Sequence, residues 1–318
     1  MTNSVPSPTA DDLAASGLSE EKLDAVSAVF FDDLAAEARG DKGVAAKLAA
    51  TTNRDVDYYD RADDLRRAAF YLASRTVAPS VAAGHYGIVS PLGVARHNGV
   101  PFNARELTWG FATAKDARYP VTPEDVRHSG ALGIKRFTLD EKADVIECVG
   151  LQLRTLRTAQ FNDNIKGKFI SPLGQAPDGY IHPLNREALL DTGKPLLLTE
   201  GLVKRDAILS AMGMEHVGVI AYTGVSIPAE RRGVGCVSLR LGSILDRCPQ
   251  ILRGRDVFLA FDGDATENSA VARAVQATAV AVGHHGAIVR VIQVPKNTVG
   301  SGIDDYLAAS HGIGRIAA

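Results

Sequence analysis

The chain has 318 residues, enough for two domains or for one large domain with an appendage. Hydrophobic residues make up 46% and charged residues 23%, which is ordinary for a soluble globular protein, and a net charge of −2 argues against a protein that coats polyanions in general. The three cysteines, Cys148, Cys236 and Cys248, lie far apart without CxxC spacing, which fits a reducing compartment and excludes a cysteine-based zinc site. No secretory signal and no apolar run of about 20 residues is present, so we expect a soluble cytoplasmic protein without a membrane partner.

The first 75 residues are predicted to form a helical region with a disordered start. Residues 1–10 are rich in Ser, Thr and Pro, as is typical of a disordered terminus. Apolar residues then recur at helical spacing from Asp11 to about Ala50, and again from about Asp60 to Ser74. The second helix carries basic side chains that either contact phosphates or lie on a solvated face: Arg61, Arg66, Arg67 and Arg75.

Residues 76–190 are predicted to form a mixed α+β region. Apolar and polar residues alternate between about 145 and 161, which indicates a strand that includes Arg154 and Arg157. Lys166 and Lys168 follow in a loop that also contains aromatic residues. Basic residues interleaved with aromatic ones can bind a nucleotide or a strand of nucleic acid, and they can equally form the outer face of a small sheet.

Residues 191–318 show the alternation of strands and helices that is typical of a parallel α/β sheet flanked by helices. Apolar runs predict strands at 195–200, 216–222, 257–261 and 287–295. Helices are expected at 202–212, where Gly213 stops the helix, at 267–282 and from Asp304 onward. A further helix over 243–252 should be perturbed by Pro249. The fold class is therefore α/β in this region, preceded by the mixed α+β and helical regions.

Acidic residues follow two of these predicted strands. Glu200 ends the first, and Asp262 and Asp264 follow the third with only Gly263 between them. If the two strands are neighbours, the three carboxylates converge at the carboxyl edge of the sheet, where open α/β folds bind their ligands. Such a cluster needs a cation, for which Mg²⁺ is the natural choice, and it suggests phosphoryl or nucleotidyl transfer. The alternative is an ordinary turn in which the aspartates cap backbone amides.

Three segments of this region resemble the Toprim family: LLLTEGLVKRDAILSAMG, VFLAFDGDATENSAVARA and GIDDYLA. Toprim domains are the metal-dependent catalytic modules of bacterial-type DNA primases, topoisomerases, small nucleases and recombination proteins. The resemblance covers residues 191–310 and implies a catalytic and metal-binding role for Glu200, Asp262 and Asp264. It is strongest to the primase-like branch, whose later acidic motif corresponds to Asp304 and Asp305 as further metal ligands. Upstream, DLAASGLSEE and LRTAQFNDNIKGKFISPLG resemble uncharacterised phage and plasmid replication proteins.

The resemblance implies primase-like nucleotidyl transfer in DNA replication, with Mg²⁺, or Mn²⁺ in its place, as the cofactor. The expected partners are a DNA or RNA/DNA template, NTPs and a replicative helicase. Two alternatives stay open, namely a Toprim nuclease that hydrolyses phosphodiesters and a non-catalytic accessory protein that binds DNA or a helicase. The residues expected to bind phosphate or nucleic acid are Lys204, Lys166, Lys168, Arg154 and Arg157.

The sequence departs from the family pattern at Lys204, where primases of this branch often have an aspartate. Its ammonium would reduce the negative charge of the site and bind a phosphate, at the cost of a second metal, or it would simply lie along the helix surface. The chain also lacks the zinc-ribbon cysteines of bacterial primases and the GxxxxGK[ST] motif of P-loop ATPases. A topoisomerase is excluded because no tyrosine has the context of a DNA-gate domain.

Overall fold

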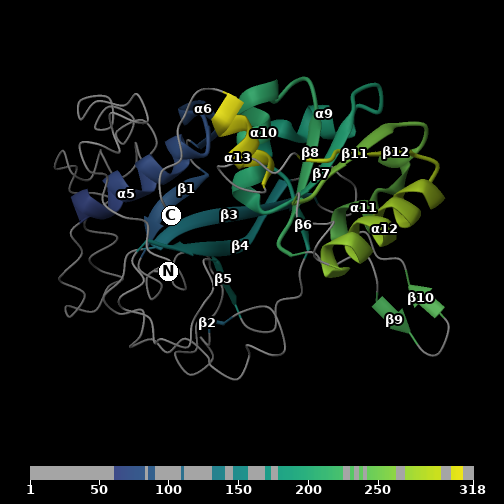
Figure 1. Cartoon of the computed structure of the whole chain (residues 1–318), viewed down its shortest axis with the longest axis horizontal. Coiled ribbons are helices and arrows are strands. Elements are labelled where there is room, and N and C mark those ends of the chain that lie inside the picture. The colour runs from purple at the N-terminus through teal and green to yellow at the C-terminus, as the bar shows by residue number, and fades with distance from the viewer. Residues whose placement is uncertain are drawn as a thin grey trace.

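The computed structural model describes residues 61–82, 85–89, 109–110, 131–139, 146–156, 169–172, 178–224, 230–232, 236–238, 242–262, 269–294 and 302–310. These residues form two five-stranded sheets, flanked by helices, and a small two-stranded ribbon of β9 (Glu230–Arg232) and β10 (Cys236–Ser238) (Figure 1). The helices predicted before residue 60 lie outside the described residues. No helix in the described ranges is long and apolar enough to cross a bilayer.

The C-terminal sheet has the strand order β12-β11-β7-β8-β6. Four of its strands run parallel: β7 (Leu196–Glu200), β8 (Gly218–Tyr222), β11 (Asp256–Ala260) and β12 (Ile288–Val291). The edge strand β6 (Gly179–Tyr180) pairs with β8 in the antiparallel direction. The predicted α/β class is confirmed. The sheet also includes residues upstream of 191, where the sequence placed the start of this region.

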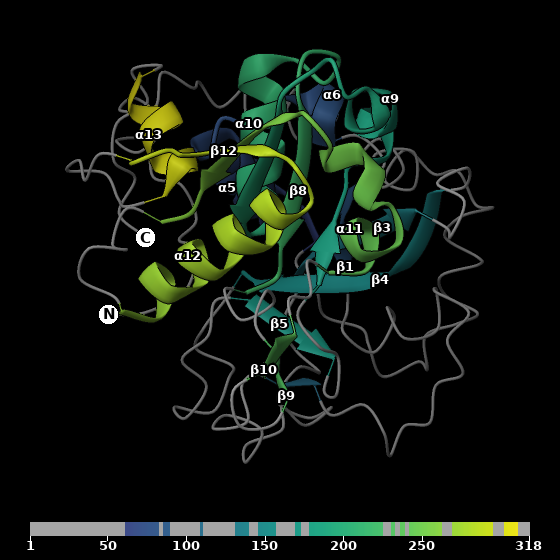
Figure 2. The same ribbon diagram turned by 90° about the vertical axis from the view of Figure 1, so that its right-hand side faces the viewer.

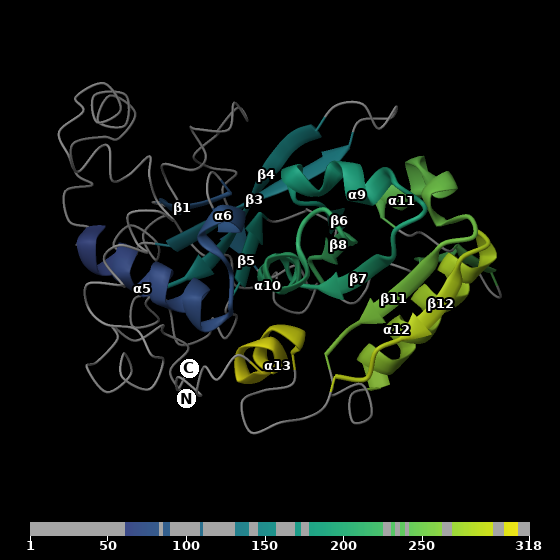
Figure 3. The ribbon, with the colours of Figure 1, turned by 90° about the horizontal axis from the view of Figure 1, so that it is seen from above.

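Helices cover both faces of this sheet. α10 (Leu202–Met212) and α13 (Ile303–Ser310) lie side by side on one face (Figure 3). The other face is covered by α9 (Arg186–Leu190), which follows the 3₁₀ turn η1 (Pro183–Asn185), by α11 (Ser243–Arg247) and by α12 (Ser269–His284) (Figure 2). A 3₁₀ turn, η2 (Pro249–Leu252), follows α11. The predicted interruption by Pro249 is confirmed, because a proline cannot continue the hydrogen bonding of an α-helix.

The strand residues alternate between two hydrophobic clusters, one on each face of the sheet. Leu197 of β7 packs in the cluster on the α10 face, whereas Leu196 and Leu198 pack in the cluster on the α12 face. All three are buried, and so are Val219 and Ile220 on the neighbouring strand β8. Burial on both faces explains why these strands read as continuous apolar runs in the sequence.

The second sheet is antiparallel and has the strand order β1-β3-β4-β5-β2. Its strands are β1 (Tyr86–Val89), β2 (Trp109–Gly110), β3 (Ala131–Leu139), β4 (Ile146–Thr155) and β5 (Phe169–Pro172). β4 confirms the strand predicted from about residue 145. β3 was not predicted, because its Arg136 is buried at a position where alternation would require an apolar residue.

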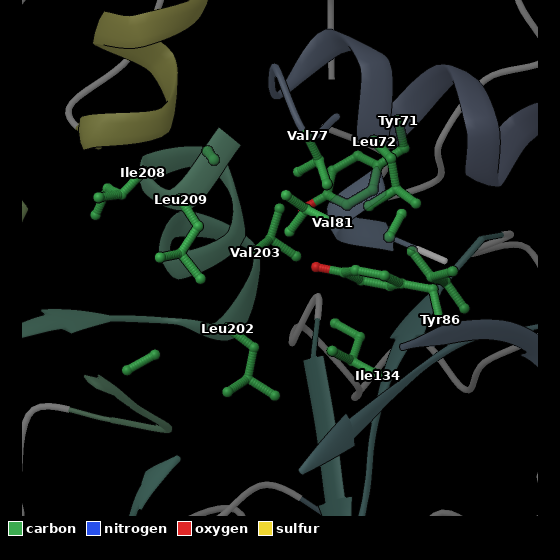
Figure 4. Packing of buried hydrophobic residues seen from close by; sticks show 14 of the residues in the cluster. Tyr71, Leu72, Val77, Val81, Tyr86, Ile134, Leu202, Val203, Ile208 and Leu209 are labelled. Atoms are coloured by element: carbon green, nitrogen blue, oxygen red, sulfur yellow. The ribbon is translucent and has the colours of Figure 1, made fainter. Parts of the chain in front are cut away.

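A shared hydrophobic cluster joins the two sheets. α5 (Arg61–Ser74) contributes Leu72, the short α6 (Pro79–Ala82) contributes Val81, and Val77 lies between the two helices. The antiparallel sheet contributes Tyr86 and Ile134. The residues of α10 in the cluster are Leu202, Val203, Ile208 and Leu209 (Figure 4). The cluster thus contains residues from all three regions that the sequence defined. Burial of this common apolar surface stabilises one arrangement of the upstream elements against α10.

A buried polar network lies beside this cluster. Arg205 of α10 donates from Nε to Asp206 Oδ1 at 2.7 Å and from Nη1 to the carbonyl oxygen of Ile181 at 2.8 Å. The Tyr86 hydroxyl donates to Asp206, and Arg205 contacts the ring of His85. Burial and the neighbouring Arg205 lower the pKa of His85, which keeps this imidazole neutral. The network connects β1 to α10 across the sheets.

Candidate functional site

Glu200 and Asp262 lie at the carboxyl edge of two neighbouring parallel strands. β7 and β11 pair directly, with Thr199 opposite Ala260, and the Thr199 hydroxyl donates to the carbonyl oxygen of Ala260 at 2.8 Å. From β7 the chain passes through α10 to β8 on one side, whereas β11 is followed by β12 on the other side. The two strands therefore flank the point where the connections diverge, which is where open α/β sheets bind their ligands.

A pocket of about 360 Å³ opens at this edge. The parallel-sheet region contributes the acidic residues Glu200, Asp262, Asp304 and Asp305 together with Lys204. The upstream region contributes Tyr71, Arg75, Gln152, Arg154 and Phe169. Of the residues predicted to form the site, the structure thus brings six together: Glu200, Asp262, Asp304, Asp305, Lys204 and Arg154. Asp264, Arg157, Lys166 and Lys168 lie outside the described residues.

A glycine shapes the turn that carries Glu200. Gly201 has a φ of 91°, which glycine adopts without a steric penalty, and its amide donates to the carbonyl oxygen of Tyr222 at 2.7 Å. The chain therefore turns directly from β7 into α10, whose first residues line the pocket. No side chain caps this end of α10, so its amide groups add a positive field beside Glu200.

Lys204 extends into the pocket instead of along the surface of α10. Its ammonium forms an ion pair with Asp262, and only 17% of its side chain is exposed. Burial alone would lower the pKa of Lys204, but attraction to Asp262, Asp304 and Glu200 outweighs it and raises the pKa. The lysine is therefore a fixed cation within the acidic cluster.

The two adjacent aspartates of α13 have different roles. Asp305 accepts a hydrogen bond from the amide of Gly302 at 3.3 Å, in the manner of a capping box, and it also pairs with Arg75. Asp304 accepts from Arg75 Nη1 at 2.9 Å through Oδ2, whereas its buried Oδ1 has no hydrogen-bond partner. Burial and the adjacent Asp304 raise the pKa of Asp305, although Arg75 opposes this. Asp304 Oδ1 is thus the buried oxygen of this pair that has no hydrogen-bond partner.

The C-terminal capping motif of α5 positions Arg75 at the pocket. The amide of Val77 bonds the carbonyl oxygen of Leu72 at 3.0 Å and that of Thr76 bonds Ala73 at 2.9 Å, which is a Schellman motif. This motif requires a left-handed residue, and Thr76 adopts it with a φ of 58°, an uncommon conformation for a β-branched side chain. The Arg75 guanidinium then reaches α13.

Arg154 lies in the central part of the antiparallel sheet and faces the same pocket. Its guanidinium carbon lies 4.6 Å from the centre of the Tyr71 ring and 5.2 Å from that of Phe169. Phe169 is also its direct cross-strand partner on β5. Burial lowers the pKa of Arg154, and repulsion from Arg75 adds to this. Phe169, one of the aromatic residues that the sequence places beside the basic loop, is therefore packed against this guanidinium.

The donor chemistry of the pocket fits a hard divalent cation in part. Carboxylate oxygens from three loops line it, and the buried Asp304 Oδ1 is unpartnered. Against this, Lys204 already pairs with Asp262, and no three His, Cys, Asp or Glu side chains in the described part of the chain are placed to hold a metal ion. Asp264, the third expected acid, is outside that part. Glu200, Asp262 and Asp304 line the pocket but do not converge on one point as they are placed, and the ion pair between Lys204 and Asp262 would have to open before they could hold an ion together.

Sequence reasoning missed the contributions of Tyr71 and Gln152 and the pairing of Arg75 with α13. The sequence predicts for Arg75 either a phosphate contact or a place on a solvated helix face. It is separated from Asp304 by 229 positions, and no local periodicity links residues over that distance. The positive φ of Thr76 is equally invisible in the sequence.

Comparison with known proteins assigns no activity. Residues 187–313 match the family model described as "Domain of unknown function (DUF3854)", which covers the parallel sheet from α9 to α13. No curated protein and no solved structure matches the chain. The similarity to this uncharacterised family therefore covers the half of the pocket that contributes Glu200, Lys204, Asp262 and Asp304.

Proposed function

We propose that the chain is a Toprim-type enzyme that uses Mg²⁺, or Mn²⁺ in its place, for primase-like nucleotidyl transfer in DNA replication. The observation that carries the proposal is the placement of Glu200 and Asp262 at the diverging edge of β7 and β11, in one pocket with the unpartnered Asp304 Oδ1. A DNA or RNA/DNA template and NTPs are the proposed substrates, and a replicative helicase is the proposed partner.

The acidic and the basic residues of the pocket have different roles in this proposal. Glu200, Asp262 and Asp304 would hold the metal ion, which when bound supplies a Lewis acid for the phosphoryl oxygens. Lys204 and Arg75 bind and orient the negative charge of the phosphates. Alternatively to binding the metal, Glu200, at the end of β7, would accept the proton of the attacking hydroxyl. Asp264 would add a further ligand from the loop after β11.

The ion pair between Lys204 and Asp262 favours a second candidate, a non-catalytic protein that binds DNA or a helicase. A lysine that neutralises a metal ligand permanently would leave a folded scaffold without metal chemistry. A nuclease uses the same carboxylates with water as the nucleophile, and the pocket by itself does not favour it over the transferase.

One set of assays tests the proposal. The protein is incubated with single-stranded template, NTPs and Mg²⁺, and short RNA products are expected. Shortening of labelled DNA without NTPs would instead assign the nuclease. Inertness in both assays, with binding of DNA or helicase retained, would overturn the enzymatic proposal in favour of the accessory role.

The assays include two matched variants of the same strand. Asp262→Asn, at the carboxyl end of β11, should abolish activity. Asp256→Asn, at the opposite and exposed end of β11, should leave it unchanged. Full activity in Asp262→Asn would show that the assigned edge is not the catalytic site.

A further inference from the structure

Arg154 is a buried cation whose hydrogen-bonding capacity is largely unused. The residue is 3% exposed, and its Nε and Nη1 have no hydrogen-bond partner. Leaving buried, charged N–H groups unpaired is costly, and native structures seldom do so without a reason. Because Arg154 lines the pocket, a ligand that enters the pocket can supply the missing acceptors.

The surroundings of Arg154 orient the guanidinium rather than neutralise it. The rings of Tyr71 and Phe169 lie 4.6 and 5.2 Å from its guanidinium carbon and stabilise the cation, and the Tyr71 side chain also hydrogen-bonds it, but Nε and Nη1 still have no partner. A guanidinium held by aromatic faces presents a planar fork of N–H donors, which matches two oxygens of one phosphate. The geometry around Arg154 is therefore that of an anion receptor.

The same pocket contains an unpartnered group of opposite charge, Asp304 Oδ1. Arg154 and Asp304 do not pair with each other, although attraction between them raises the pKa of Arg154 against the larger effect of burial. A phosphate that carries a divalent cation would satisfy both groups at once, with its oxygens on Arg154 and its cation at Asp304. A simple carboxylate or a neutral ligand would satisfy only one of them.

We propose that Arg154, packed against the rings of Tyr71 and Phe169, is the receptor for the terminal phosphate of a nucleoside polyphosphate in this pocket. The inference rests on the proposed function for the identity of the nucleotide, but the phosphate contact stands on the unpaired N–H groups. A terminal phosphate has no substituent beyond it, so it reaches a buried guanidinium more readily than a backbone diester with a nucleoside on each side. Arg154 is thereby a binding residue contributed by β4, outside the parallel sheet.

Binding of tripolyphosphate and of ATP in the presence of EDTA tests this contact without catalysis. Calorimetry on the full chain should show that Arg154→Lys, which keeps the charge but loses the fork, weakens both ligands by about tenfold or more. Phe169→Leu removes one of the two aromatic rings packed against Arg154 and should weaken the binding of both ligands about threefold. Arg290→Met alters an exposed arginine at the edge strand and should bind as the wild type does.

Unchanged affinity for tripolyphosphate in both Arg154→Lys and Phe169→Leu, each shown to be folded by circular dichroism, would overturn the receptor. If Arg154→Lys does not fold, the affinity of Phe169→Leu for tripolyphosphate alone tests the receptor. A single-stranded oligonucleotide without a terminal phosphate serves as the third ligand. Loss of its binding in the variants, with tripolyphosphate unaffected, would assign Arg154 to backbone phosphates and contradict the proposal.

The two proposals fail separately. Asp262→Asn should keep its affinity for tripolyphosphate in EDTA, because the asparagine does not contact the receptor. A wild-type protein that binds tripolyphosphate through Arg154 but makes and cleaves no nucleic acid would sustain the receptor and refute the enzyme. A protein that is active on nucleic acid, but whose Arg154→Lys variant binds tripolyphosphate as tightly as the wild type, would support the enzyme and refute the receptor.

Discussion

Arg75 donates a hydrogen bond from Nη1 to Asp304 Oδ2 at 2.9 Å across 229 positions of the chain. The contact joins the end of α5 to the first turn of α13 and closes the pocket over the edge of the parallel sheet. Burial would lower the pKa of Arg75, but its attraction to Asp304, Tyr71 and Asp305 raises it, so the guanidinium stays charged. The pair also fixes which oxygen of Asp304 remains for a ligand.

Replacing Arg75 with methionine should destabilise the fold by about 1–3 kcal/mol, because two adjacent carboxylates lose their counter-ion. The pKa of Asp305 is already raised, and it should rise further in the variant. Because the pKa of Asp305 is raised in the folded state, its ionised form destabilises the fold. This destabilisation is present above the folded-state pKa and disappears as the pH falls below the pKa of the unfolded state. Urea denaturation at pH 7 and pH 4 should therefore show a larger deficit of the variant, relative to wild type, at pH 7. An equal deficit would contradict the electrostatic explanation.

Replacing Lys204 with methionine should increase the affinity for Mn²⁺ about tenfold, because the ammonium no longer competes for Asp262. Calorimetry on wild type and variant measures this change. Lys204→Arg, which retains the charge, is the control and should not bind the ion more tightly. If the methionine variant binds Mn²⁺ no better than wild type, the acids around Lys204 do not form a metal site.

The contribution of Lys204 to the free energy of unfolding should depend on pH in a direction set by its raised pKa. The folded pKa is raised above its ordinary value of 10.5, so the stabilisation is fully present below that value and is lost as the pH rises through the folded pKa. The difference in unfolding free energy between wild type and Lys204→Met should thus be the same at pH 7 and pH 9. A difference that shrinks over this range would contradict a raised pKa.

Replacing Gly302 with alanine should displace Asp304 and weaken the protein by about 1–3 kcal/mol. A β-carbon at this position would lie 2.4 Å from Asp304 Oδ1 and 2.9 Å from Lys204 Cε, both closer than atoms can approach. Gly283→Ala is the matched control, because that glycine lies within α12 and its added methyl group would meet Val289 only at 4.0 Å. The control should be neutral or more stable by about 0.5–1 kcal/mol. Equal behaviour of the two variants in urea denaturation would refute the crowding at Gly302.

Replacing Tyr86 with phenylalanine should cost about 1–3 kcal/mol, because buried Asp206 loses the hydroxyl donor. Tyr306→Phe alters an exposed tyrosine and should be neutral. Since Tyr86 packs in the cluster shared by both sheets, the variant should shift a single unfolding transition, monitored by circular dichroism and by tyrosine absorbance. Two separate transitions would show that the sheets unfold independently.

Much of the parallel-sheet region could be predicted from the sequence because its signals are local. The apolar runs of β7, β8 and β11, the glycine stop after α10 and the proline after α11 each act within a few residues. The antiparallel sheet was harder to predict. In β3 the buried Arg136 interrupts the alternation, and its packing against Tyr180 at 5.3 Å depends on a strand from the other sheet.

In the parallel-sheet region, local sequence signals specify the order of the strands and helices and place Glu200 and Asp262 at strand ends. Hydrophobic periodicity and turn residues encode such features in neighbouring positions. The pairing of Lys204 with Asp262, the binding of Arg75 to α13 and the packing of Arg154 against two aromatic rings depend on the tertiary fold. The first two of these contacts join residues that are 58 and 229 positions apart in the chain. Their partners are set by how the two sheets pack on a common core, which no short stretch of sequence specifies.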